Sequence, residues 1–117
     1  MMTLPPLGVN TRRAYPRVWV SLPAGWSTLS GQSYHGRVYD LSVGGLFLWP
    51  GAGASAREIG PGSYVRLKLA SRDDGSLVGV AGEVRWRGIS PEHACEGVGI
   101  EFDRLCPQLV ATLCANQ

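Results

Sequence analysis

Apolar and polar residues alternate along much of this 117-residue chain with a period of two, the pattern of strands that are buried on one face. The clearest case is residues 64–70, where Val65, Leu67 and Leu69 are predicted to face inward between outward-facing basic residues. Turn-forming residues separate this segment from others like it, so we expect short strands joined by tight connections. The other predicted strands cover residues 18–22, 34–41, 46–49, 77–87 and 98–102.

Glycine and proline predict where these strands bend or end. Residues 23–25, Pro-Ala-Gly, are expected to end the first strand. Gly79 and Gly82 are expected to mark bulges or sharp bends in the long strand over 77–87. Residues 88–96 are expected to form a loop before the last strand.

Leucines recur every four residues near the C-terminus and predict one short helix with an apolar stripe. These are Leu105, Leu109 and Leu113, and Pro107 suits the first turn of a helix that ends near Asn116. Six short strands and one terminal helix favour a small antiparallel barrel, with the helix covering an open end or packing on the outer wall. The predicted fold is therefore all-β, a six-stranded antiparallel β-barrel with a short C-terminal α-helix.

The composition agrees with a single globular domain. The chain is 44% hydrophobic and 17% charged, and 16 glycines with 8 prolines indicate many turns. We expect a flexible N-terminal tail over residues 1–11 and one domain over 12–117. The net charge of +2 is too small for non-specific nucleic-acid binding. No apolar run approaches the roughly 20 residues of a membrane span, and the N-terminus lacks a signal-peptide layout, so we expect a cytoplasmic protein.

Three cysteines, Cys95, Cys106 and Cys114, are an odd number without CxxC spacing. This usage predicts reduced thiols, as in the cytoplasm. A metal site that combines them with His35 or His93 is disfavoured, because neither histidine has a ligand-like spacing beyond the loose His93-x-Cys95 pair. We therefore expect no metal.

Three arginines, Arg12, Arg13 and Arg17, lie within six residues directly before the first predicted strand. Pro16 disfavours the α conformation at Tyr15, so the segment is expected to be extended. Arg13 and Arg17 then project from the same side, roughly 13 Å apart. Guanidinium groups in this arrangement suit phosphate oxygens and the O6/N7 edge of guanine. The alternative is a solvated basic tail that leads into a strand.

A second polar motif, Asp40-x-Ser42-x-x-Gly45, follows along the chain. Strand periodicity predicts that Val38 and Asp40 share a face. Asp40 and Ser42 are also two apart, so this polar pair is expected on one face of the barrel wall, with Leu41 and Val43 on the opposite face. An ionised aspartate suits the N1–H and N2–H₂ donors of guanine, and a serine hydroxyl can donate to a phosphate. Gly45 lets the backbone approach a ligand or adopt a positive φ. The alternative is a hairpin corner in which the aspartate and serine bind turn amides.

Together, Arg-x-x-x-Arg and Asp-x-Ser-x-x-Gly resemble the PilZ domain family, bacterial receptors for the second messenger cyclic di-GMP. The resemblance extends over roughly residues 12–114. It implies a six-stranded antiparallel PilZ-type barrel with a C-terminal helix, and a single PilZ domain over residues 12–117. Further segments that look like family features are Gly60–Tyr64, Gly82–Trp86 and Gly97–Phe102.

The resemblance also implies a ligand site. Arg12, directly before the first motif arginine, implies that the ligand binds as a stacked pair of cyclic di-GMP molecules. Trp86 either stacks on a guanine or belongs to the core. The motif residues implied to hold guanine edges and phosphates, or to allow their close approach, are Arg13, Arg17, Asp40, Ser42 and Gly45.

We therefore expect a non-catalytic cyclic di-GMP receptor or adaptor. Ligand phosphates would order the N-terminal arginine segment over the barrel and change the surface offered to a downstream protein partner, for instance in motility, pilus or polysaccharide machinery. The first alternative is a PilZ-fold interaction module that does not depend on the nucleotide. A barrel that binds single-stranded nucleic acid through its tryptophans and arginines is disfavoured by the low net charge. An enzyme is least expected, because serines, histidines, cysteines and acids form no recognisable catalytic set.

Overall fold

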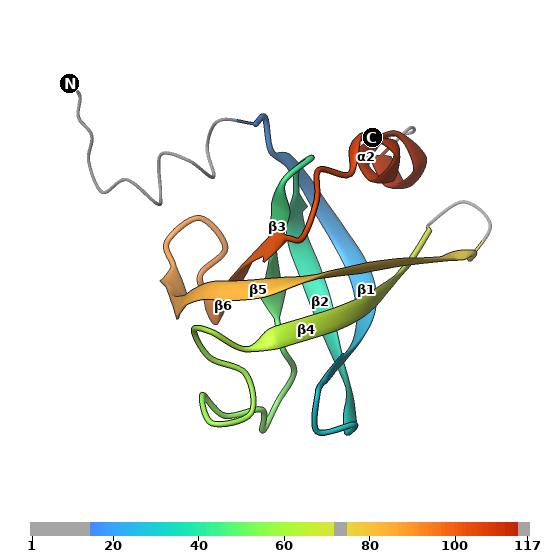
Figure 1. Cartoon of the computed structure of the whole chain (residues 1–117). Coiled ribbons are helices and arrows are strands. Elements are labelled where there is room, and N and C mark those ends of the chain that lie inside the picture. The colour runs from blue at the N-terminus through green and yellow to red at the C-terminus, as the bar shows by residue number, and fades with distance from the viewer. Residues whose placement is uncertain (1–14, 72–74, 115–117) are drawn as a thin grey trace.

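The computed structural model describes residues 15–71 and 75–114. Its strands form one closed antiparallel barrel in the order β1-β2-β3-β6-β5-β4, closed by pairing of β4 with β1 (Figure 1). The predicted six-stranded antiparallel barrel with a C-terminal helix is therefore confirmed. The elements are β1 (Val18–Thr28), β2 (Ser33–Leu41), β3 (Gly45–Trp49), β4 (Tyr64–Ala70), β5 (Leu77–Ser90), β6 (Cys95–Phe102) and α2 (Pro107–Cys114).

Alternation of apolar side chains builds the barrel interior. In β4, Val65, Leu67 and Leu69 are buried while the basic residues between them are exposed, as the sequence pattern predicts. The same alternation in the other strands contributes residues such as Leu22, Val84 and Ile100, all fully buried, to one continuous core. Most of the large aliphatic residues of the strands therefore share a single interior, while a few large apolar side chains such as Trp19 and Ile89 stay exposed.

The first strand is longer than predicted, because residues 23–25 do not end it. β1 continues to Thr28, and Ala24 and Trp26 keep the buried phase of Leu22. Pro23 lies just before Ala24, where β1 begins to pair with β4, so its missing N–H is tolerated at a point with only one neighbouring strand. The extra residues give β1 enough length to close the barrel.

A β-bulge in β2 changes which residues share a face. The β2–β3 ladder passes from Val38↔Leu48 to Asp40↔Phe47, which leaves Tyr39 as an extra residue. Val38 and Leu48 belong to the core, whereas Asp40 lies opposite Phe47 on the side away from it. The prediction that Val38 and Asp40 share a face is therefore wrong, because the bulge shifts the period-two pattern by one residue.

The predicted bulges at Gly79 and Gly82 in β5 are also wrong. The β4–β5 ladder runs without interruption through both glycines, and the irregularity lies between Val84 and Trp86, on the side that pairs with β6. β5 continues to Ser90 and β6 begins at Cys95, so the loop expected over residues 88–96 is only a short turn between the two strands. This turn, the β5–β6 loop (residues 91–94), reaches back over the outer wall.

Helix α2 contributes to the core with part of the predicted leucine stripe. Leu109 and Leu113 are buried in the main cluster, whereas Leu105 precedes the helix and is 54% exposed. Cys95 and Cys106 are free thiols, and burial raises the pKa of each. In the part of the chain that the structure describes, no helix is long and apolar enough to cross a bilayer.

Candidate functional site

Arg17 and Asp40 come from the two sequence motifs and meet on the outer wall. Antiparallel pairing of β1 with β2 places the start of one strand beside the end of the other, with Trp19 opposite Asp40. Arg17 Nη1 lies 3.5 Å from Asp40 Oδ2. The Asp40 side chain is only 6% exposed, so this ion pair is largely shielded from solvent on the acidic side. The structure therefore brings one residue of each motif together across 23 positions.

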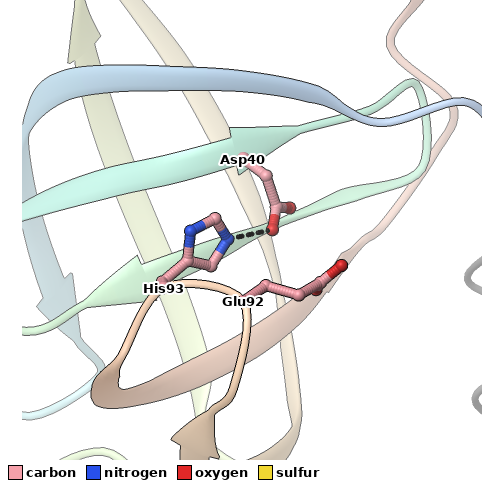
Figure 2. Close-up of side chains that lie close together, drawn as sticks. All are labelled: Asp40, Glu92 and His93. Atoms are coloured by element: carbon pink, nitrogen blue, oxygen red, sulfur yellow. Dashed lines mark hydrogen bonds and ion pairs between the residues drawn. The ribbon is translucent and has the colours of Figure 1, made fainter.

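The β5–β6 loop adds two residues to this cluster that the motifs do not contain. Arg17 Nη2 lies 3.0 Å from Glu92 Oε2, and His93 Nε2 lies 2.8 Å from Asp40 Oδ2. Figure 2 shows His93 and Glu92 on the loop and Asp40 on the strand opposite, with the imidazole pointing at the carboxylate. In the sequence, His93 suggested only a metal ligand beside Cys95, and no motif pointed to Glu92.

Aromatic rings hold His93 in place. Its imidazole packs against Trp19, Tyr39 and Phe47, with ring centroids 4.7, 5.7 and 5.1 Å away, respectively. These rings project from β1, β2 and β3, so one loop side chain is fixed against three strands of the wall. His93 therefore positions Asp40 through a hydrogen bond whose geometry is set by aromatic packing.

Ser42 is buried and its hydroxyl serves the turn between β2 and β3. Its Oγ accepts hydrogen bonds from the amides of Gly44 and Gly45, each at 3.2 Å, and can donate to the Gly45 carbonyl at 3.2 Å. The hairpin-corner interpretation therefore describes the serine correctly. To donate to a ligand phosphate, the hydroxyl would have to release the Gly45 carbonyl.

Gly45 is needed by the neighbouring strand. A Cβ at this position would lie 2.2 Å from the backbone oxygen of Ile100 in β6, a distance that real Cβ atoms essentially never show. Gly45 is not among the glycines of positive φ. The sequence suggested two reasons for this glycine, a positive φ or a close approach of its backbone to a ligand. The structure shows a close approach, but to the backbone of β6.

A cavity of about 350 Å³ lies beside these residues. Trp86 contributes to its wall and stacks on Phe47, with ring centroids 5.7 Å apart and planes at 27°. Tyr15 and Arg104 also line the cavity. Arg12 and Arg13 lie outside the described residues. Predicted site residues that line this cavity are Arg17, Asp40, Ser42, Gly45 and Trp86.

The PilZ domain family model matches residues 11–114 of the chain. This chain belongs to the PilZ domain family. No curated protein matches the chain.

Solved structures agree with this assignment at the level of the fold. The Bacillus subtilis inhibitor of motility MotI/DgrA superposes with a TM-score of 0.66 and 19% identity over 89% of this chain and 49% of that protein. The PilZ domain of Escherichia coli YcgR, solved with c-di-GMP, gives a TM-score of 0.63 and 16% identity over 87% of this chain and 86% of that one. The PilZ domain of CeSA from a cellulose-synthesising bacterium gives a TM-score of 0.53 and 17% identity over 74% of this chain and 79% of that one. This PilZ domain thus spans about half the length of the Bacillus protein.

The charged cluster of this PilZ domain contains two carboxylates, one guanidinium and one imidazole. Ligand atoms of Asp40, Glu92 and His93 all lie within 4.8 Å of one another, a spacing that could hold a metal ion. Arg17 already pairs with both carboxylates and supplies the positive charge. The acid that His93 contacts is therefore Asp40 of the cavity, and not the Cys95 thiol that the His93-x-Cys95 spacing suggested.

Proposed function

We propose that this PilZ domain is a non-catalytic receptor for cyclic di-GMP, which binds in the cavity between the start of β1, the end of β2 and the β5–β6 loop. The observation that carries the proposal is the convergence of Arg17 and Asp40 on this cavity. A guanidinium suits phosphates and the O6/N7 edge of guanine, and a carboxylate suits the N1–H and N2–H₂ donors on its other edge. The YcgR PilZ domain solved with c-di-GMP shares the fold, which supports the assignment.

Three other predicted site residues, Arg12, Arg13 and Trp86, also have roles in this proposal. Arg12 and Arg13 join Arg17 around the ligand phosphates, which orders the N-terminal arginine segment over the barrel and changes the surface offered to a protein partner. Arg12, directly before the first motif arginine, favours two stacked cyclic di-GMP molecules, as the resemblance to the family implies. Trp86, in the cavity wall, stacks on a guanine.

Titration calorimetry with cyclic di-GMP tests this proposal. Arg17→Ala removes charge-assisted hydrogen bonds and is expected to cost about 2–4 kcal/mol of binding, or roughly 30- to 1,000-fold in Kd. Arg37→Ala is the matched control, because Arg37 bonds Ser21 Oγ on the surface and does not line the cavity. The wild type is expected to bind two molecules per chain and Arg12→Ala one.

Two results would contradict the proposal. If Arg37→Ala weakened binding as much as Arg17→Ala, the nucleotide would be held by net charge rather than by this cavity. If the wild-type domain gave no heat at micromolar cyclic di-GMP, the receptor assignment would be wrong. The second result would favour a PilZ-fold interaction module that acts without the nucleotide.

A further inference from the structure

Arg17 is shared between the motif aspartate and an acid that belongs to neither motif. Its Nη1 faces Asp40 at 3.5 Å, and its Nη2 makes the shorter contact, 3.0 Å, with Glu92. The Arg17 side chain is 25% exposed and that of Glu92 is 38% exposed, so the second ion pair is only partly solvated. Glu92 therefore binds one of the two terminal nitrogens through which a guanidinium grips a phosphate.

The β5–β6 loop limits how far Glu92 can move from Arg17. Ala94 has a φ of 56°, and it is the one described residue other than glycine with a positive φ. The Ala94 amide donates to the Ser90 carbonyl at 2.8 Å, and the His93 amide donates to Ser90 Oγ at 3.3 Å. The next side chain, His93, is only 5% exposed and is fixed by Asp40 and the surrounding rings. Because the backbone of this turn is already fixed, pairing with Arg17 costs Glu92 little further backbone entropy.

A nucleotide phosphate and the Glu92 carboxylate compete for the same side of Arg17. When a binding-competent state is only partly populated, the apparent affinity falls by that fraction. Displaced Glu92 would also remain close to the phosphate and repel it. Both effects act in the same direction, so the acid weakens binding rather than supporting it.

We propose that Glu92 competes with the nucleotide for Arg17 and so sets the affinity of this domain for cyclic di-GMP. His93 fixes the loop that carries Glu92. The inference rests on the proposed function, because it concerns the same arginine and the same cavity. Removing the Glu92 charge is expected to tighten cyclic di-GMP binding roughly two- to tenfold. This range combines the loss of a partly solvated ion pair that competes for Arg17 with the loss of the repulsion between Glu92 and the phosphate.

Calorimetry of the wild type, Glu92→Gln and Glu96→Gln with cyclic di-GMP tests the competition. Glu96 lies near the same loop but pairs with Arg87 at 3.1 Å and does not line the cavity, so its replacement controls for the loss of one surface charge. Tighter binding in Glu92→Gln alone is the expected result. The difference is expected to shrink as salt is raised, because screening weakens the Arg17–Glu92 pair. Unchanged or weaker binding in Glu92→Gln would overturn the proposal.

A second readout does not need the nucleotide. In NMR spectra of the arginine Nε–Hε groups, Glu92→Gln is expected to shift the Arg17 signal and speed its exchange with water, while the Arg37 signal stays in place. An unaltered Arg17 signal would overturn the proposal even if the domain binds cyclic di-GMP. If no variant binds the nucleotide, the receptor function fails, and the spectra still decide whether Glu92 holds Arg17.

A metal titration separates this competition from a cation site. Asp40, Glu92 and His93 place ligand atoms within 4.8 Å of one another, so zinc would need to displace Arg17 from both acids. We expect no zinc binding at micromolar concentration in the wild-type domain. Zinc binding that Glu92→Gln abolishes would overturn the proposal, because the cluster would then bind a metal rather than hold the arginine.

Discussion

The replacement of Gly45 by alanine separates two reasons for a glycine in the Asp-x-Ser-x-x-Gly motif. One reason is room for a ligand, and the other is room for the neighbouring strand. A Cβ on Gly45 would lie 2.2 Å from the Ile100 oxygen, and real Cβ atoms are essentially never closer than 3.0 Å to such an atom. The obstacle is the backbone of β6, the neighbouring strand of the barrel wall, so β3 and β6 must move apart to admit one methyl group.

The cost of Gly45→Ala follows from what this movement disturbs. Overpacking a well-packed interior costs about 1–3 kcal/mol. The β3–β6 ladder runs only from Gly45↔Glu101 to Leu48↔Val98, and each ladder hydrogen bond that is weakened costs up to about 1 kcal/mol. We therefore expect the free energy of unfolding to fall by about 2–4 kcal/mol and Tm to fall by roughly 10 °C.

Urea unfolding followed by tryptophan fluorescence measures this loss, with Gly79→Ala as the matched control. A Cβ on Gly79 would have its nearest neighbour, the Leu67 oxygen, at an ordinary 3.8 Å, so this variant is expected to stay within about 0.5 kcal/mol of wild type. If Gly45→Ala were as stable as Gly79→Ala, the strand-approach argument would be refuted. Unchanged stability with lost nucleotide binding would assign the glycine to the ligand instead.

Two further predictions concern the helix and the barrel rim. Leu109→Ala is expected to lower the free energy of unfolding by about 2–5 kcal/mol, because this side chain lies in the core and is 3% exposed. Leu105 is 54% exposed, so Leu105→Ala is expected to cost less than about 0.5 kcal/mol. Equal costs of the two variants in urea unfolding would show that the helix does not contribute to the core as described. The Tyr64 hydroxyl donates to Asp103 Oδ2 at 2.6 Å, and this bond raises the pKa of Tyr64, so Asp103→Ala should lower that pKa in an alkaline titration of tyrosinate absorbance. Because the protonated phenol is the donor, its stabilisation is present below the ordinary tyrosine pKa and is lost as pH rises through the raised one; an unaltered titration would contradict the assignment.

Local sequence patterns were sufficient for the type and order of the elements and for the resemblance to the family. A period of two in residues 64–70 predicted the bounds and the buried face of β4, and the spacing of Leu109 and Leu113 predicted the buried side of α2. These patterns work because burial of alternate or every fourth residue is a property of one element against one core. The two polar motifs likewise carried the resemblance to the family that the match over residues 11–114 establishes.

The phase of the strands could not be predicted from the same patterns. Tyr39 forms a bulge that turns Asp40 away from the core face of Val38, and nothing local in residues 34–41 marks it. Pro23 reads as a strand end, yet it lies inside β1 at a point where only one strand is its neighbour. Bulges and tolerated prolines depend on how adjacent strands meet when the barrel closes, and this is settled by packing between residues far apart in the chain.

The composition of the charged cluster was decided by the tertiary structure alone. The sequence singled out Arg17 and Asp40, because their spacing is regular within two motifs. Glu92 and His93 have no such spacing. Glu92 reaches the cavity and His93 reaches Asp40 only because the β5–β6 loop folds back across the wall, where aromatic side chains fix His93. Sequence periodicity reports which face of an element is buried, whereas the meeting of two charges depends on barrel closure, which brings Arg17 and Glu92 into contact across 75 positions.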